Sequence, residues 1–154
     1  MHFSCNMFVL YSFSHSASTV LGQEQFVATY LSAGVISALA SHLHQVVMKV
    51  PTGSLGASGA IMGILGVVCS AMPDARLCVV FLPMLTFGAF TALKSLIVFD
   101  SLGLVCRWMF FDHAAHLGGA LFGLGYVFGE GHKLVALYQS QIVDVWRQIR
   151  SKRV

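Results

Sequence analysis

Charged residues are scarce in this sequence. Only 10% of its 154 residues are Asp, Glu, Lys or Arg, whereas an average soluble domain has about 25%. Hydrophobic residues make up 56% of the chain, and the mean hydropathy is +0.78. A soluble protein of this size could not bury so much apolar surface, and large exposed apolar patches aggregate. The composition therefore excludes an ordinary soluble domain and indicates a membrane protein.

Long stretches of the chain contain no charged residue at all. These stretches are residues 2–23, 25–48, 50–73, 77–93 and 113–129. A membrane-spanning helix needs about 20 mainly apolar residues. We therefore predict one helical bundle with five spans, near residues 2–21, 25–45, 55–72, 77–98 and 112–129.

Turn and cap residues separate the predicted spans. Glu24 falls in the first turn of the second span, where the helix dipole favours an anion. Arg76 is expected to begin the fourth span, and Asp100 to lie in the last loop. Asp112 is suited to be the N-cap of the fifth span.

The four cysteines lack the spacing of a metal site or of a disulfide framework. His113 and His116 lie three residues apart and could share a helical face, so a metal site is conceivable. The His-Glu-x-x-His arrangement of zinc proteases is missing, however. We predict no metal and no cofactor, and a structural or rim position for His113.

Basic residues gather after residue 130. Two readings are open for this tail: an amphipathic segment at the bilayer surface, or a nucleic-acid patch. Aromatic interleaving for base stacking is not evident, so the first reading is favoured and no nucleic-acid partner is expected. The orientation in the membrane stays open, because five spans put the two chain ends on opposite sides.

Glycines form stripes on the third and fifth predicted spans. The third span has Gly56, Gly59 and Gly63, and the fifth has Gly119 and Gly123. Small residues let helices approach closely in a membrane, which favours direct packing of these two spans. Two odd-numbered spans run parallel, so residues near their starts are expected at similar depth.

Ser58 and His116 lie near the starts of these two spans. A serine hydroxyl needs an adjacent base to become a nucleophile, and a neutral imidazole can be that base. Taken singly, each residue has a structural alternative. The Ser58 hydroxyl could bond to its own helix, and His116 could be a core histidine whose hydrogen bonds are all made within the protein. Together they indicate serine–histidine catalysis inside a membrane.

His2 and Asn6 share one face of the first predicted span, four residues apart. Both can donate hydrogen bonds, as an oxyanion hole requires. The structural alternative is polar contact between helices.

These motifs carry a resemblance to a known family. Gly56-x-Ser58-Gly59, Ala115-His116-x-x-Gly119-x-x-x-Gly123 and His2-x-x-x-Asn6 resemble those of the rhomboid intramembrane serine proteases, over roughly residues 1–130. Stretches such as 54–62 and 111–123 are similar to the mitochondrial branch of that family.

The resemblance implies a rhomboid-like bundle with five of the six core spans, and a protease core at 1–130 followed by a basic tail at 131–154. It implies a Ser58–His116 dyad without a catalytic aspartate, with Asn6 and His2 as oxyanion donors. The substrates would be single-span membrane proteins in the mitochondrial inner membrane. Because the first core span of the family has no counterpart here, we expect an upstream part to be missing and this chain alone to be weakly active or inactive.

An alternative function is that of a catalytically impaired, truncated rhomboid-like protein that binds transmembrane helices without cleaving them. A channel or transporter subunit is a more remote alternative, because the sparse intramembrane charge offers no ion path.

Overall fold

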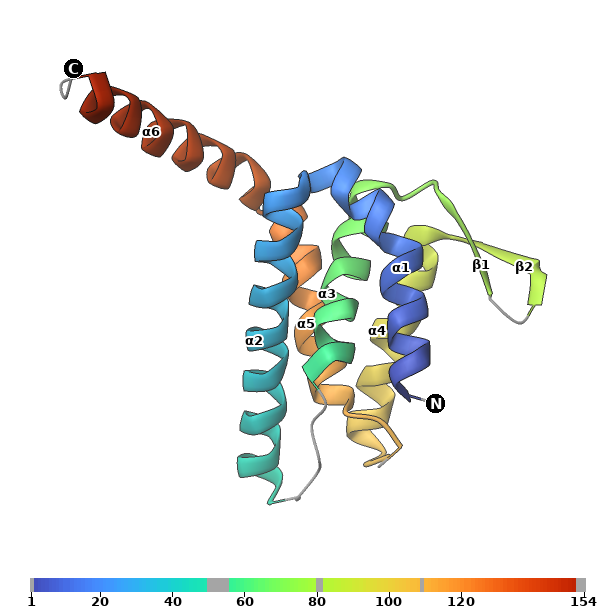
Figure 1. Ribbon diagram of the computed structural model, residues 1–154. Coiled ribbons are helices and arrows are strands. Elements are labelled where there is room, and N and C mark those ends of the chain that lie inside the picture. Colours follow the sequence, from blue (N-terminus) through green and yellow to red (C-terminus); the bar gives the residue numbers. More distant parts are fainter. Residues whose placement is uncertain (1, 50–55, 80–81, 109, 152–154) are drawn as a thin grey trace.

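The chain folds into a helical bundle with one β-hairpin (Figure 1). The computed structural model describes residues 2–49, 56–79, 82–108 and 110–151. The elements follow one another as α1 (His2–Leu21), α2 (Gln23–Met48), α3 (Gly56–Ala71), β1 (Arg76–Val79), β2 (Leu82–Gly88), α4 (Ala89–Val105), α5 (His113–Phe128) and α6 (Gly131–Ser151). Four of the helices predicted from the sequence, at 2–21, 25–45, 55–72 and 112–129, correspond to α1, α2, α3 and α5.

The prediction of a single helix over residues 77–98 is wrong. Strands β1 and β2 pair as an antiparallel hairpin, with Arg76 opposite Gly88. The Ala89 N–H donates to the Ala75 carbonyl at 2.7 Å, and α4 begins only there. An uncharged apolar run suits a strand as well as a helix, so the absence of charge did not distinguish them. Arg76 therefore begins a strand.

The displaced start of α4 also corrects the position of Asp100. This residue was expected in the last loop, but it lies inside α4, which continues to Val105. Its side chain is buried, at 2% exposure.

Helix α2 has small and hydroxyl side chains on its buried face and large apolar ones on its exposed face. The buried residues are Thr29, Ala33, Ser37 and Ser41. The exposed stripe consists of Val27, Leu31, Val35, Leu39 and Leu43. Both sets repeat every four residues, so each lies on one helical face. This distribution is the reverse of a soluble protein's and suits a helix with lipid on its outer side.

Among the described residues, α2 is the one helix both long and apolar enough to cross a membrane by length and composition. The apolar helix at Ala57–Ala71 is shorter than that test requires.

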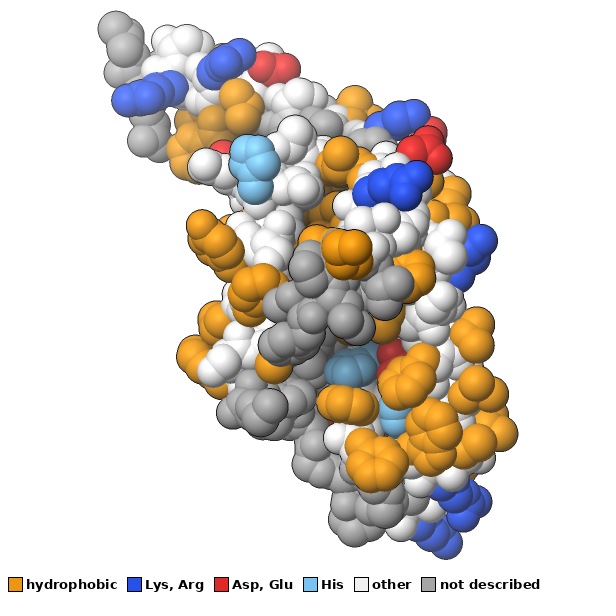
Figure 2. Space-filling view, turned by 90° about the vertical axis from the view of Figure 1, so that its right-hand side faces the viewer, with side chains coloured by type: hydrophobic (Ala, Val, Ile, Leu, Met, Phe, Trp, Pro, Cys, Tyr) orange, Lys and Arg blue, Asp and Glu red, His pale blue; other side chains and the backbone are white. Residues whose placement is uncertain are grey.

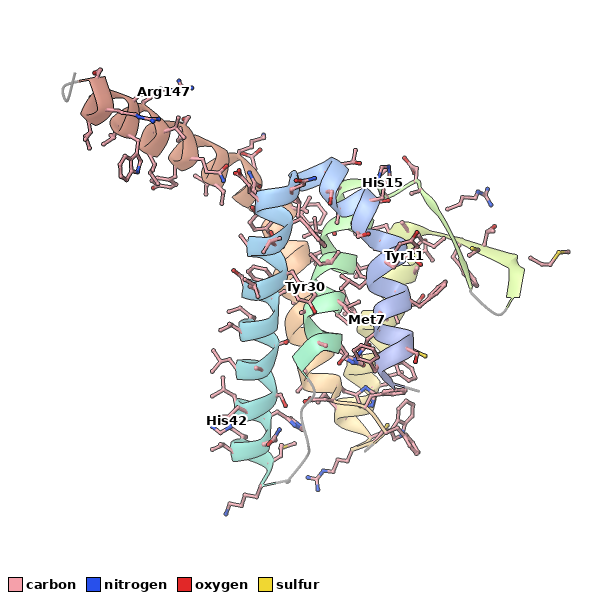
Figure 3. All side chains as sticks on the ribbon, in the orientation of Figure 1. Met7, Tyr11, His15, Tyr30, His42 and Arg147 are labelled. Carbon is pink, nitrogen blue, oxygen red and sulfur yellow. The ribbon has the colours of Figure 1, made fainter. Side chains whose placement is uncertain are left out.

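Helix α3 lies at the centre of the bundle, packed against α1, α2, α4 and α5 (Figure 1). Ile64 and Val68 of α3 form a buried cluster with Ala17 of α1. Tyr30 of α2 packs against this cluster, and Figure 3 shows it between α2 and α3. A second cluster joins α3 to α4 through Leu65 and Leu93.

Helices α3 and α5 pack through their backbones and run in the same direction. The close approaches pair three residues of α3 with successively later residues of α5: Gly59 with Ala115, Gly63 with Gly119, and Gly66 with Gly123. Because both series ascend together, the helices are parallel. A side chain at these glycines would separate the helices.

Helix α6 extends away from the bundle, with Arg147 far out along it (Figure 3). Its N-terminal half is linked to α2, where Gln139 Nε2 donates to Glu24 Oε2 at 3.3 Å. One side of α6 carries apolar residues that the rest of the chain does not cover: Leu134, Tyr138, Ile142, Val145 and Ile149.

We predict that Gly119→Ala lowers the stability of the bundle. The added methyl would collide with the carbonyl oxygen of Gly59, which belongs to the backbone and cannot rotate away. Overpacking of this kind costs about 1–3 kcal/mol. The measurement is the midpoint of thermal unfolding in detergent micelles.

Gly125→Ala is the matched control on the same helix, because a Cβ at Gly125 meets nothing within 4 Å. Alanine is favoured over glycine in a helix by about 1 kcal/mol, so this variant is expected to be as stable as the wild type or more so. Equal destabilisation by both variants would contradict the packing argument.

Candidate active site

The predicted site residues come from helix ends that gather at one end of the bundle. Helices α1, α3 and α5 begin at this end, and α4 ends there (Figure 1). Residues far apart in the sequence therefore lie at a common level.

Ser58 is the third residue of α3 and lies in its first turn. Its side chain is buried, at 9% exposure. The N–H groups of a first helical turn have no partner within the helix and favour a negative charge near them. The local structure thus puts a hydroxyl beside donors that suit a developing oxyanion.

His116 is the fourth residue of α5, and its side chain is 16% exposed. The residue after Ser58 and the residue before His116 are in close contact, since a Cβ at Gly59 would lie 3.1 Å from the Ala115 carbonyl oxygen. The packing of α3 on α5 therefore brings the chain segments of the two predicted catalytic residues together.

Asn6 is half-buried in the second turn of α1, the helix that packs on the other side of α3. His2 begins α1, and its side chain lies outside the described residues.

Asp112 caps α5, as the sequence predicts. Its Oδ1 accepts a hydrogen bond from the Ala115 N–H at 3.0 Å. Its Oδ2 accepts a hydrogen bond from the Ser41 hydroxyl at 2.5 Å, which ties the start of α5 to α2. The cap thus anchors the helical turn that carries His116.

Asp100 is the site residue that the sequence analysis missed. His113 Nδ1–H donates to Asp100 Oδ1 at 2.7 Å, and His116 Nδ1 lies 3.4 Å from the same oxygen. The sequence carries a signal for this residue, because Asp100 is the single charged residue between Lys94 and Arg107. It was overlooked because the fourth span was placed too early in the chain.

Aromatic rings enclose the two imidazoles. Phe99, Trp108 and Phe111 surround His113, with ring centroids 5.6, 6.2 and 6.1 Å away. Phe111 also lies 6.1 Å from His116. Figure 2 shows histidine and acidic side chains set among hydrophobic ones on this face. Enclosure of this kind keeps water from the buried carboxylate.

His113 is 3% exposed, and within the part of the chain that the structure describes its Nε2 has no hydrogen-bond partner. It is therefore a buried residue and does not lie at a rim.

A cavity of about 230 Å³ adjoins the His113 imidazole. It lies between the C-terminal ends of α2 and α4 and the start of α5, and its lining includes His44, Arg107 and His113. Among the described residues, no group of three His, Cys, Asp or Glu side chains could hold a metal ion.

Comparison with known proteins assigns this chain to a family. The model of the Rhomboid domain matches residues 1–133, and the chain belongs to the rhomboid family. Family membership and the mostly helical structure together define an all-α membrane protein.

The chain is similar to the presenilin-associated rhomboid-like protein, mitochondrial, of Homo sapiens, with 53% identity over 97% of this chain and 39% of that protein. The Bos taurus protein of the same name is 52% identical over 97% of this chain and 40% of its own length. Rhomboid protein 1, mitochondrial, of Saccharomyces cerevisiae is 34% identical over 97% of this chain and 41% of its own length. No solved structure matches significantly.

The chain thus spans about two fifths of the length of these relatives. All three are named mitochondrial, which confirms the expected mitochondrial location.

We predict that Asp112→Ala lowers the thermal unfolding midpoint, because it removes the cap of α5 and the acceptor for Ser41. Loss of an N-cap costs about 1 kcal/mol. Asp112→Asn keeps an oxygen that can accept from the Ala115 N–H, and asparagine is as good an N-cap as aspartate. The asparagine variant is therefore expected to retain most of the stability, and equal losses in the two variants would show that the cap is not the stabilising contact.

Proposed function

We propose that this protein is an intramembrane serine endopeptidase in which Ser58 is the nucleophile and His116 the general base. The observation that supports this most directly is the backbone contact between Gly59 and Ala115. This contact joins the first turns of α3 and α5, which carry Ser58 and His116. The chain also belongs to the rhomboid family.

In this proposal, the Ser58 hydroxyl attacks the carbonyl carbon of the scissile peptide while His116 Nε2 takes its proton. Collapse of the tetrahedral intermediate releases the amine, which receives that proton from His116. The remaining acyl-enzyme is hydrolysed by water, and the imidazole again takes and returns a proton.

The oxyanion of the intermediate needs donors that are in place before reaction. The N–H of Ser58 at the start of α3 would be one, and the side chain amide of Asn6 another. His2 is proposed as a further donor from the first turn of α1.

The substrates would be membrane proteins with a single span. An intact transmembrane helix hides its peptide bonds in internal hydrogen bonds, so it must unwind before Ser58 can reach a carbonyl. Residues 1–130 would form the protease core in the mitochondrial inner membrane. The basic segment 131–154, which includes α6, would lie at the bilayer surface.

The test is cleavage of a single-span model substrate by the full-length protein in liposomes, with products identified by mass spectrometry. Ser58→Ala and His116→Ala are each expected to lower the turnover number by at least about a thousand-fold, as in other serine proteases that lose a member of the catalytic unit.

Two matched controls show whether the losses are specific. Ser70→Ala removes a hydroxyl from the far end of α3 that donates to its own helix, at 2.6 Å from the Gly66 carbonyl oxygen. His42→Ala removes an exposed imidazole from α2 (Figure 3). Both controls are expected to cleave normally. Substrate binding without cleavage by the wild type would instead support a non-catalytic protein that binds transmembrane helices.

A further inference from the structure

Asp100 is an acidic residue in the interior of a membrane protein. At 2% exposure it has almost no contact with solvent. An isolated carboxylate is very costly in such surroundings, so buried charges are paired and hydrogen-bonded. Ionisable residues inside the membrane are functional candidates for the same reason.

In the described part of the chain, two imidazoles face Asp100 Oδ1. His113 Nδ1 is at 2.7 Å and His116 Nδ1 at 3.4 Å. A carboxylate only accepts hydrogen bonds, so an imidazole nitrogen turned toward it carries the proton. With the proton on Nδ1, Nε2 of a neutral ring keeps its lone pair and can act as a base.

We propose that Asp100 is a positioning residue for His116: it holds the ring in the Nδ1–H form and leaves Nε2 free to take the proton of Ser58. This inference rests on the function proposed above. When Nε2 takes the proton, the ring becomes a cation beside the Asp100 carboxylate, which stabilises it. The Nδ1 proton stays on His116 throughout, and the Nε2 proton goes on to the leaving amine.

His113 has a supporting part in this arrangement. Its hydrogen bond of 2.7 Å holds the Asp100 carboxylate in place, and the rings of Phe99, Trp108 and Phe111 hold His113 in turn. Asp100 lies on α4, and His113 and His116 lie on α5, so the arrangement depends on how these two helices pack.

The test is Asp100→Asn in the full-length protein, assayed in liposomes. Asparagine has nearly the same shape but can present its amide N–H groups to Nδ1, which favours the wrong tautomer. The turnover number is expected to fall at least tenfold with KM changed less than twofold, consistent with the range for general base catalysis. Asp74→Asn, which removes an exposed carboxylate before the hairpin, is the matched control and should leave both constants unchanged.

A second pair of variants tests whether Asp100 acts through His116. Adding Asp100→Asn to His116→Ala is expected to cause no further loss of residual cleavage, because the group that Asp100 orients is already gone. A further loss of tenfold would overturn the proposal.

The tautomer of His116 can be read in the wild-type protein, which removes any dependence on the folding of variants. In nitrogen-15 NMR of histidine-labelled protein, the His116 signals are assigned by their loss in His116→Ala. The neutral ring is expected to carry its proton on Nδ1. A proton on Nε2, or a turnover number unchanged in folded Asp100→Asn, would overturn the role of Asp100.

The two proposals fail in different ways. If Ser58→Ala cleaves as well as the wild type, the proposed function fails. If Ser58→Ala is inactive and folded Asp100→Asn is fully active, only the role of Asp100 fails.

Discussion

The backbone contact between α3 and α5 is the constraint on which the rest of the structure depends. At Gly119 the two helices lie so close that even a methyl group would collide with the Gly59 carbonyl oxygen. In a bilayer, where lipid surrounds helices with an equally apolar medium, such close packing is a main source of association. The contact runs parallel for two helical turns, so it also sets Ser58 and His116 at the same depth.

The bilayer explains why the polar side chains face inward. Helix α2 turns Ser37 and Ser41 to the bundle and its large apolar residues outward. The Ser41 hydroxyl bonds the cap of α5, which carries His116 in its first turn. Inward polar groups thus stabilise the same helical ends that form the candidate site.

Local patterns in the sequence predicted four helices and the Asp112 cap, because apolar length and capping depend on residues near one another. The prediction of a fourth helix at residues 77–98 was wrong for a related reason. The residues of β1 and β2 are apolar enough for a helix, but the backbone groups of the two strands pair with each other. Composition alone could not show that pairing, and the wrong start of α4 put Asp100 in a loop.

The sequence by itself determined that this chain is a helical membrane protein of the rhomboid type and which serine and histidine begin parallel helices. Only the tertiary structure decided what faces His116 Nδ1. Asp100 and His116 lie on different helices, and their oxygen and nitrogen approach to 3.4 Å through the packing of α4 on α5. The periodicity of apolar residues in the sequence indicates which residues share a helical face. The rotation and depth at which two helices dock depend on contacts made all along them.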